Sequence, residues 1–148
     1  MTRVAIVGAG AIGCLVAARL SATPAEVTLV ARSAVADIIR RNGITMVTPL
    51  GRVQRKPVTV TDDPMAAGHQ DIVFVCVKAH ALGGTLDALS QLLGPRTILV
   101  PMVNGIPWWY PLGQGGPLRD YRLESVDPDG RLWRAGAGPG PGPSAPGR

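Results

Sequence analysis

The chain of 148 residues is poor in the residues that mark disulfide frameworks, metal centres and membrane spans. Its two cysteines, Cys14 and Cys76, lie on apolar segments, so we expect buried, reduced thiols in a cytoplasmic protein. The two histidines, His69 and His80, lack the spacing of zinc ligands or of a nucleophile triad, so surface or loop roles are expected. No stretch approaches the roughly 20 apolar residues that a bilayer requires, and the N-terminus lacks a signal-peptide pattern.

Lysine is also scarce and occurs only at Lys56 and Lys78, so arginine supplies most of the positive charge. The formal net charge is +5, but the basic residues are scattered and form no stripe. This pattern predicts a modest preference for anionic ligands, and it argues against a nucleic-acid partner. The length is sufficient for one domain with a real hydrophobic core.

Glycine, in contrast, is abundant and forms a patterned turn near the N-terminus. An apolar run, Val4–Val7, leads into this turn, and a helical stripe of Ile12, Leu15, Val16 and Leu20 follows it. The order of strand, glycine-rich turn and helix is typical of a dinucleotide-binding site. The turn consists of Gly8, Ala9, Gly10, Ala11, Ile12 and Gly13.

Each glycine of this turn has a predicted physical role. Gly8 allows a sharp turn at the end of the strand. Gly10 has no Cβ, so a pyrophosphate can approach the main chain, and Gly13 allows the helix to pack closely on the strand. The N–H groups of the first helical turn then face the phosphates. The alternative is a tight strand–helix turn that binds nothing.

The end of the second predicted strand favours NADP over NAD. Residues 27–30 form an apolar run that ends in Ala31, Arg32 and Ser33, where the NAD form of the site would place an acidic residue. Arg32 can form a fork with a 2′-phosphate, and Ser33 can add a hydroxyl. The alternative is that Arg32 is a solvated loop arginine.

The rest of the chain alternates between helical and strand patterns, as a doubly wound α/β fold requires. We therefore predict a Rossmann-like, mostly parallel sheet in a single domain, residues 1–134, with a disordered tail at 135–148. The expected elements are a helix at 35–39 closed by Asn42-Gly43, a hairpin of strands at 44–48 and 52–60, a short helix from Asp63-Pro64 to Gly68, a buried strand at 71–77, a helix marked by Leu82, Leu86, Leu89 and Leu93 and stopped by Gly94-Pro95, and a strand at 97–100.

Two polar residues follow the later strands. Lys78 comes directly after the strand that ends at Val77, and Asn104 follows the strand that ends at Val100. Ligands of open α/β sheets lie outside the carboxyl ends of the strands, so both residues are expected to face the same crevice as the glycine turn. Taken singly, each could also be an ordinary solvated lysine or turn asparagine.

Together these residues resemble the ketopantoate reductase (2-dehydropantoate 2-reductase) family. The resemblance rests on the glycine turn, on Arg32, on the Val77-Lys78-Ala79 step and on Asn104-Gly105-Ile106, and it extends to about residue 135. The segments most similar to one branch of the family are Asn104-Gly105-Ile106-Pro107-Trp108-Trp109-Tyr110 and Ser125-Val126-Asp127-Pro128-Asp129-Gly130.

The resemblance implies NADPH-dependent reduction of a 2-oxo acid, in pantothenate biosynthesis for the named member. It implies that the glycine turn holds the pyrophosphate, that Arg32 holds the 2′-phosphate, that Lys78 contacts the cofactor, and that Asn104 lies between nicotinamide and substrate. The resemblance implies that the general-acid lysine belongs to a helical second domain, which we do not expect within these 148 residues. We therefore expect no catalytic residue and no metal site in the chain, little or no activity by itself, and a homodimer only in a longer form.

Two further features have alternative explanations. Trp108, Trp109 and Tyr110 either line the substrate side of the crevice or, as we favour, pack against the second domain. The tail, residues 135–148, is mostly glycine and proline and cannot build a core. It is explained by a shifted reading frame in GC-rich DNA or by a natural flexible terminus. A non-catalytic NADP-binding module is the alternative to an enzyme.

Overall fold

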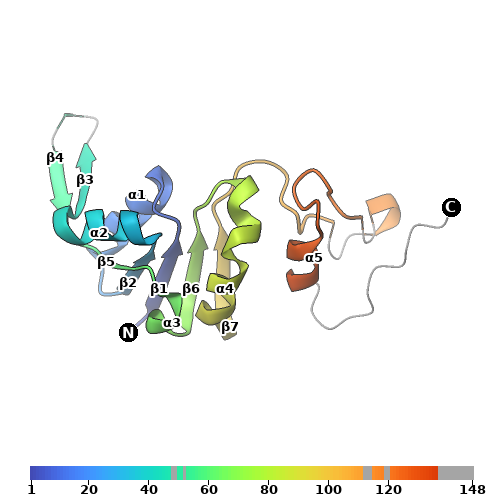
Figure 1. The fold of residues 1–148 in the computed structure, drawn as a ribbon, viewed down its shortest axis with the longest axis horizontal. Helices are drawn as coiled ribbons and strands as arrows, with labels where there is room; N and C mark the ends of the chain where they lie inside the picture. The colour runs from blue at the N-terminus through green and yellow to red at the C-terminus, as the bar shows by residue number, and fades with distance from the viewer. Residues whose placement is uncertain (48–49, 52, 112–114, 119–120, 137–148) are drawn as a thin grey trace.

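The computed structural model describes residues 1–47, 50–51, 53–111, 115–118 and 121–136 (Figure 1). The strands of the main sheet are parallel and lie in the order β5-β2-β1-β6-β7, so the predicted Rossmann-like architecture is confirmed. The strands are β1 (Arg3–Val7), β2 (Glu26–Val30), β3 (Ile44–Val47), β4 (Val53–Lys56), β5 (Thr59–Thr61), β6 (Gln70–Val75) and β7 (Leu93–Pro101). The helices are α1 (Ala11–Leu20), α2 (Ser33–Asn42), α3 (Pro64–Ala67), α4 (Leu86–Leu92) and α5 (Arg131–Gly136), with 3₁₀ turns η1 (Ala79–Thr85) and η2 (Gly116–Leu118).

The central strand β1 contributes to a hydrophobic cluster on each face of the sheet. Val4 and Ile6 pack with residues of α1 and α2 on one face, and Ala5 and Val7 pack with residues of α4 on the other. This alternation follows from the period of two in a strand. A parallel sheet covered on both faces requires apolar residues on both sides, which explains the nearly continuous apolar runs of β1 and β6.

Helix α1 buries a different face from the one its large apolar residues predicted. Its buried residues are Gly13, Ala17 and Ala18, whereas Ile12 is 49% exposed and Leu15 is 45% exposed. The helix lies so close to β1 that only small side chains fit between them, and Val16 and Leu20 pack at the margin of the cluster. The prediction of a single stripe through Ile12 and Leu15 was therefore wrong.

The segment from 44 to 61 also departs from the prediction. Strands β3 and β4 form the expected antiparallel hairpin, but the second predicted strand divides near Pro57. The following residues form β5, which pairs in parallel with β2 and extends the main sheet. Proline supplies no N–H for a ladder, so the break at this residue has a simple cause.

The predicted helix boundaries at Gly43 and Asp63 are observed, whereas the helix before β7 differs from the prediction. Gly43 ends α2 with a φ of 66°, and the Asp63 carboxylate accepts a hydrogen bond from the Met65 N–H at 3.0 Å, so both predicted caps are confirmed. Helix α4 ends at Leu92, one residue before the predicted last helical residue, and β7 already begins at Leu93 with an irregular register against β6. The predicted helix before it is divided into η1 and α4.

The segment after β7 packs against the face that carries α4. Trp108 and Leu132 join the hydrophobic cluster of Val73, Val75 and Leu92. The buried Asp127 carboxylate accepts hydrogen bonds from the N–H groups of Leu132 and Trp133, which fixes the start of α5. The predicted tail overlaps α5 at residues 135–136, and residues 137–148 lie outside the described part of the chain. Among the described helices, none has the length and apolar character of a membrane span.

Candidate functional site

The site begins with the alignment of strand ends at one edge of the sheet, the upper edge in Figure 1. Backbone hydrogen bonds join the first residues after each strand to the neighbouring strand end, so the loops leave the sheet side by side. These bonds are Ala31 N–H to Thr61 O (2.9 Å), Gly8 N–H to Val30 O (3.0 Å), Cys76 N–H to Val7 O (2.8 Å) and Met102 N–H to Val75 O (2.9 Å). Across this edge the candidates follow the order Arg32, glycine turn, Lys78 and Asn104.

The three glycines of the turn differ in what their missing side chains permit. Gly8 has a φ of +108°, which side chains other than hydrogen rarely allow. A Cβ on Gly13 would lie 1.8 Å from the Gly8 carbonyl oxygen, so this glycine is required for helix packing. Gly10 is extended, and its Cβ would have only the Cys76 carbonyl oxygen at 4.0 Å for a neighbour. The space beside Gly10 is therefore open.

The N-terminus of α1 presents free donors beside this open space. Gly10 is the N-cap residue and has no side chain to cap the helix, and the first turn carries no acidic residue. The first helical hydrogen bond joins the Cys14 N–H to the Gly10 carbonyl at 2.9 Å, so the preceding N–H groups have no acceptor within the helix. The helix dipole adds positive potential at the same point. A pyrophosphate fits this arrangement in size, charge and hydrogen bonding.

Arg32 occupies the end of β2 as the sequence predicts. It is exposed and precedes α2, and its carbonyl accepts hydrogen bonds from the N–H groups of Val35 and Ala36. The ion pairs found between described residues involve Arg3, Arg40 and Arg122 but not Arg32. The Arg32 guanidinium is thus available to an anion at this position.

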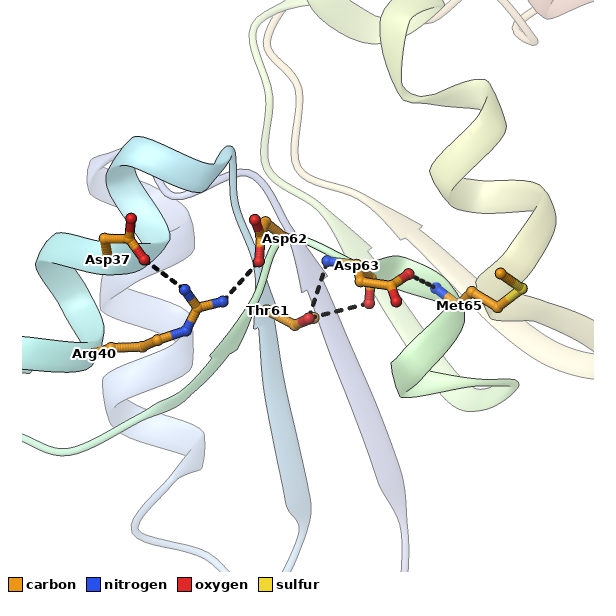
Figure 2. A network of polar contacts seen from close by, with 6 residues as sticks. All are labelled: Asp37, Arg40, Thr61, Asp62, Asp63 and Met65. Carbon is orange, nitrogen blue, oxygen red and sulfur yellow. Dashed lines mark hydrogen bonds and ion pairs between the residues drawn. The ribbon is translucent and has the colours of Figure 1, made fainter.

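A polar network that the sequence reasoning missed lies between α2 and the end of β5, the strand next to β2 (Figure 2). Arg40 donates to Asp37 at 2.6 Å and to Asp62 at 2.7 Å. A side-chain hydrogen bond from Ser33, followed by the Arg40 guanidinium, holds the pKa of Asp62 below its ordinary value. Asp62 follows β5, and because residues 52–60 were assigned to a hairpin, nothing in the pattern brought this carboxylate to the end of β2.

Lys78 and Asn104 lie at the opposite end of the same edge. Both are exposed, and each follows its strand by three residues. Lys78 precedes η1, whose first bond runs from the Ala81 N–H to the Lys78 carbonyl at 2.8 Å. The structure therefore brings these two residues to the edge that also holds the glycine turn, as predicted.

The remaining candidates have structural rather than chemical settings. Burial raises the pKa of the Cys14 and Cys76 thiols, which fits the predicted reduced thiols. Trp108 is partly buried in the cluster beneath α4, and its ring meets that of Trp109 edge to face at 5.8 Å. Tyr110 is exposed. Within the described residues, no group of three or more His, Cys, Asp and Glu side chains could hold a metal ion.

A parallel sheet with a glycine turn at the N-terminus of α1 defines an α/β domain of the dinucleotide-binding class. Residues 4–120 match the sequence profile of the family Ketopantoate reductase PanE/ApbA, and the chain belongs to this family. Proteins of this family bind NAD(P)H, and the chain resembles the N-terminal part of NAD(P)-dependent 2-oxo acid reductases.

Individual relatives support the same assignment. A 2-dehydropantoate 2-reductase of Mesorhizobium japonicum is 41% identical over 133 residues, which are 89% of this chain and 40% of the relative. A solved structure from Ralstonia solanacearum MolK2, assigned as a ketopantoate reductase, is 39% identical with a TM-score of 0.82 and covers 91% of this chain and 41% of that one. A D-mandelate dehydrogenase solved with NADH and anilino(oxo)acetate, 23% identical with a TM-score of 0.65 over 72% of this chain and 35% of that one, shares the fold. The chain thus spans about two fifths of the length of these reductases.

Proposed function

We propose that this chain is the NADPH-binding half of a reductase that converts a 2-oxo acid to a 2-hydroxy acid. The observation that carries the proposal is the position of Arg32. This arginine is exposed at the end of β2, has no acidic residue in its own loop and lies beside the open glycine turn. A 2′-phosphate is the feature that distinguishes NADPH from NADH, and a guanidinium binds it with two parallel hydrogen bonds.

The order of residues across the edge supports an extended cofactor. Arg32 would take the adenosine end, the N–H groups after Gly10 would take the pyrophosphate, and Lys78 and Asn104 would lie at the nicotinamide end. When bound there, the nicotinamide supplies a hydride to the carbonyl carbon of the substrate. Asn104, exposed after β7, can donate a hydrogen bond to a substrate oxygen and orient it.

The proposal assigns binding and positioning to this chain, and it assigns no general acid. Lys78 is the lysine at this edge, and we assign it to cofactor contact. A 2-oxo acid such as 2-dehydropantoate, which the Mesorhizobium relative is named for, is the proposed substrate class. A non-catalytic NADP-binding module would use the same residues for binding, so turnover is what separates the two functions.

Arg32→Asp tests the cofactor choice. The variant should weaken NADPH binding by about ten- to a hundredfold, because it replaces a cation beside a dianion with a carboxylate. NADH should gain relative to NADPH, since the new carboxylate accepts a hydrogen bond from the ribose hydroxyl. Fluorescence titration of both cofactors measures the two dissociation constants.

Arg96→Asp is the matched control, because it makes the same change of net charge in the N-terminal half of β7, away from the carboxyl-end edge where Arg32 lies. Equal ratios of NADPH to NADH affinity in wild type, Arg32→Asp and Arg96→Asp would show that Arg32 does not select the cofactor.

Gly10→Val tests the pyrophosphate site. The added Cβ would have no described neighbour closer than the Cys76 carbonyl oxygen at 4.0 Å, so the fold should persist. The same side chain would fill the space above the helix N-terminus, and affinity for NADPH should fall by about a hundredfold. Titration gives the affinity and circular dichroism reports the fold; a folded variant with wild-type affinity would mean that the turn is structural only.

A further inference from the structure

Asp62 lies at the same edge of the sheet as Arg32, after the neighbouring strand. Strands β2 and β5 are parallel neighbours with Val30 opposite Thr61, and the Ala31 N–H donates to the Thr61 carbonyl at 2.9 Å. Ala31 therefore lies opposite Asp62, and Arg32 is the residue after Ala31. Since neighbouring strands lie about 4.8 Å apart, the Asp62 backbone is one strand and one residue away from that of Arg32, which places a carboxylate near the proposed 2′-phosphate position.

The Asp62 carboxylate is held in place from α2. Arg40 Nη2 donates to Asp62 Oδ1 at 2.7 Å. Arg40 also donates to Asp37 at 2.6 Å, so its guanidinium lies between two carboxylates (Figure 2). The side chain of Asp62 is therefore oriented by the helix that begins directly after Arg32.

These contacts bear on cofactor choice in two ways. A carboxylate disfavours a neighbouring dianion and favours a ribose hydroxyl, which can donate to it. Arg40 acts in the opposite direction, because its positive charge offsets that of Asp62.

We propose that Asp62 and Arg40 are a specificity-determining pair: Asp62 accepts the ribose 2′-hydroxyl of NADH, and Arg40 offsets its charge so that the 2′-phosphate of NADPH can bind beside Arg32. The pair makes this site able to take both cofactors, with Arg32 favouring NADPH and Asp62 limiting that preference. This inference rests on the proposed function, since it concerns the same cofactor site.

The test measures the dissociation constants of NADPH and NADH in dilute buffer for Asp62→Asn, Arg40→Gln and the double variant. Asp62→Asn should raise the preference for NADPH, and Arg40→Gln should lower it, each by about two- to fivefold, as exposed charge pairs allow. In the double variant the two opposite effects should largely cancel, because the contributions of the two charges at the 2′-phosphate add. Adenosine 2′,5′-bisphosphate and AMP should show the same changes, which places the effect at the 2′-position.

Asp37→Asn is the matched control, because it removes an equal charge from the other side of Arg40. It should leave the preference unchanged, and about 0.5 M salt should suppress the effects of the other variants. Equal shifts in Asp37→Asn and Asp62→Asn, or no shift in either Asp62→Asn or Arg40→Gln at an unchanged melting temperature, would overturn the inference while leaving cofactor binding intact. A wild-type chain that binds neither cofactor would overturn the proposed function and this inference with it.

Discussion

Gly13→Ala is expected to lower the melting temperature of the chain by at least about 10 °C. Its Cβ would lie 1.8 Å from the Gly8 carbonyl oxygen and 3.2 Å from the Cys76 Cβ. The closest of these atoms is backbone, which cannot rotate away, so α1 must move off β1. We estimate a loss of at least about 3 kcal/mol, at roughly 3 °C per kcal/mol for a domain of this size.

A thermal melt followed by circular dichroism measures this effect without cofactor. Gly83→Ala is the matched control, because its added Cβ would meet nothing within 4 Å, and its melting temperature should stay near that of wild type. If Gly13→Ala melts within about 2 °C of wild type, α1 does not pack on β1 as closely as the structure has it.

A protein made of residues 1–148 alone is expected to bind NADPH but to reduce 2-dehydropantoate at least about 10⁴-fold more slowly than the Mesorhizobium relative. A general acid contributes about 10²–10⁴ in rate, and we assign none to this chain. Holding the substrate against the nicotinamide contributes up to roughly 7–11 kcal/mol, and the candidate residues at this edge, Lys78 and Asn104, are both exposed to water.

Steady-state oxidation of NADPH, with the relative assayed alongside, is the measurement. Lys78→Ala should leave the residual rate nearly unchanged at saturating NADPH, because the lysine is assigned to binding. A turnover near that of the relative, abolished in Lys78→Ala, would show that Lys78 is the general acid and that the chain is a complete catalyst.

The parts of the fold that depend on local patterns could be predicted from the sequence. The glycine turn between β1 and α1, the proline-led start of α3 and the cap at Gly43 each follow from the chemistry of a few adjacent residues. The buried face of α1 could not be predicted in this way. Hydrophobicity favoured Ile12 and Leu15, but the distance between helix and sheet, a tertiary property, selected Gly13 and Ala17.

The candidate site also contains residues that local patterns predict and one that depends on tertiary structure. Arg32, Lys78 and Asn104 were found because each lies two or three residues after an apolar strand, and the carboxyl ends of parallel strands meet at one edge. Asp62 was missed because its strand is only three residues long and was merged with the hairpin strand before it. The short run Thr59–Thr61 after Pro57 was the available signal, since a proline break followed by β-branched residues can begin a new strand.

The pairing of β1 with β6 also sets the order in which the chain can fold during synthesis. Val4 lies opposite Ile72, whereas its partner in β2, Val27, is much closer in sequence. At about 5–20 residues per second, a ribosome needs about 3–14 seconds to add the segment that separates β1 from β6. During this interval β1 can pair only with β2, and its other edge stays open to neighbouring chains. The nascent chain is thus most prone to aggregate in the interval between synthesis of the central strand β1 and synthesis of its second partner, β6.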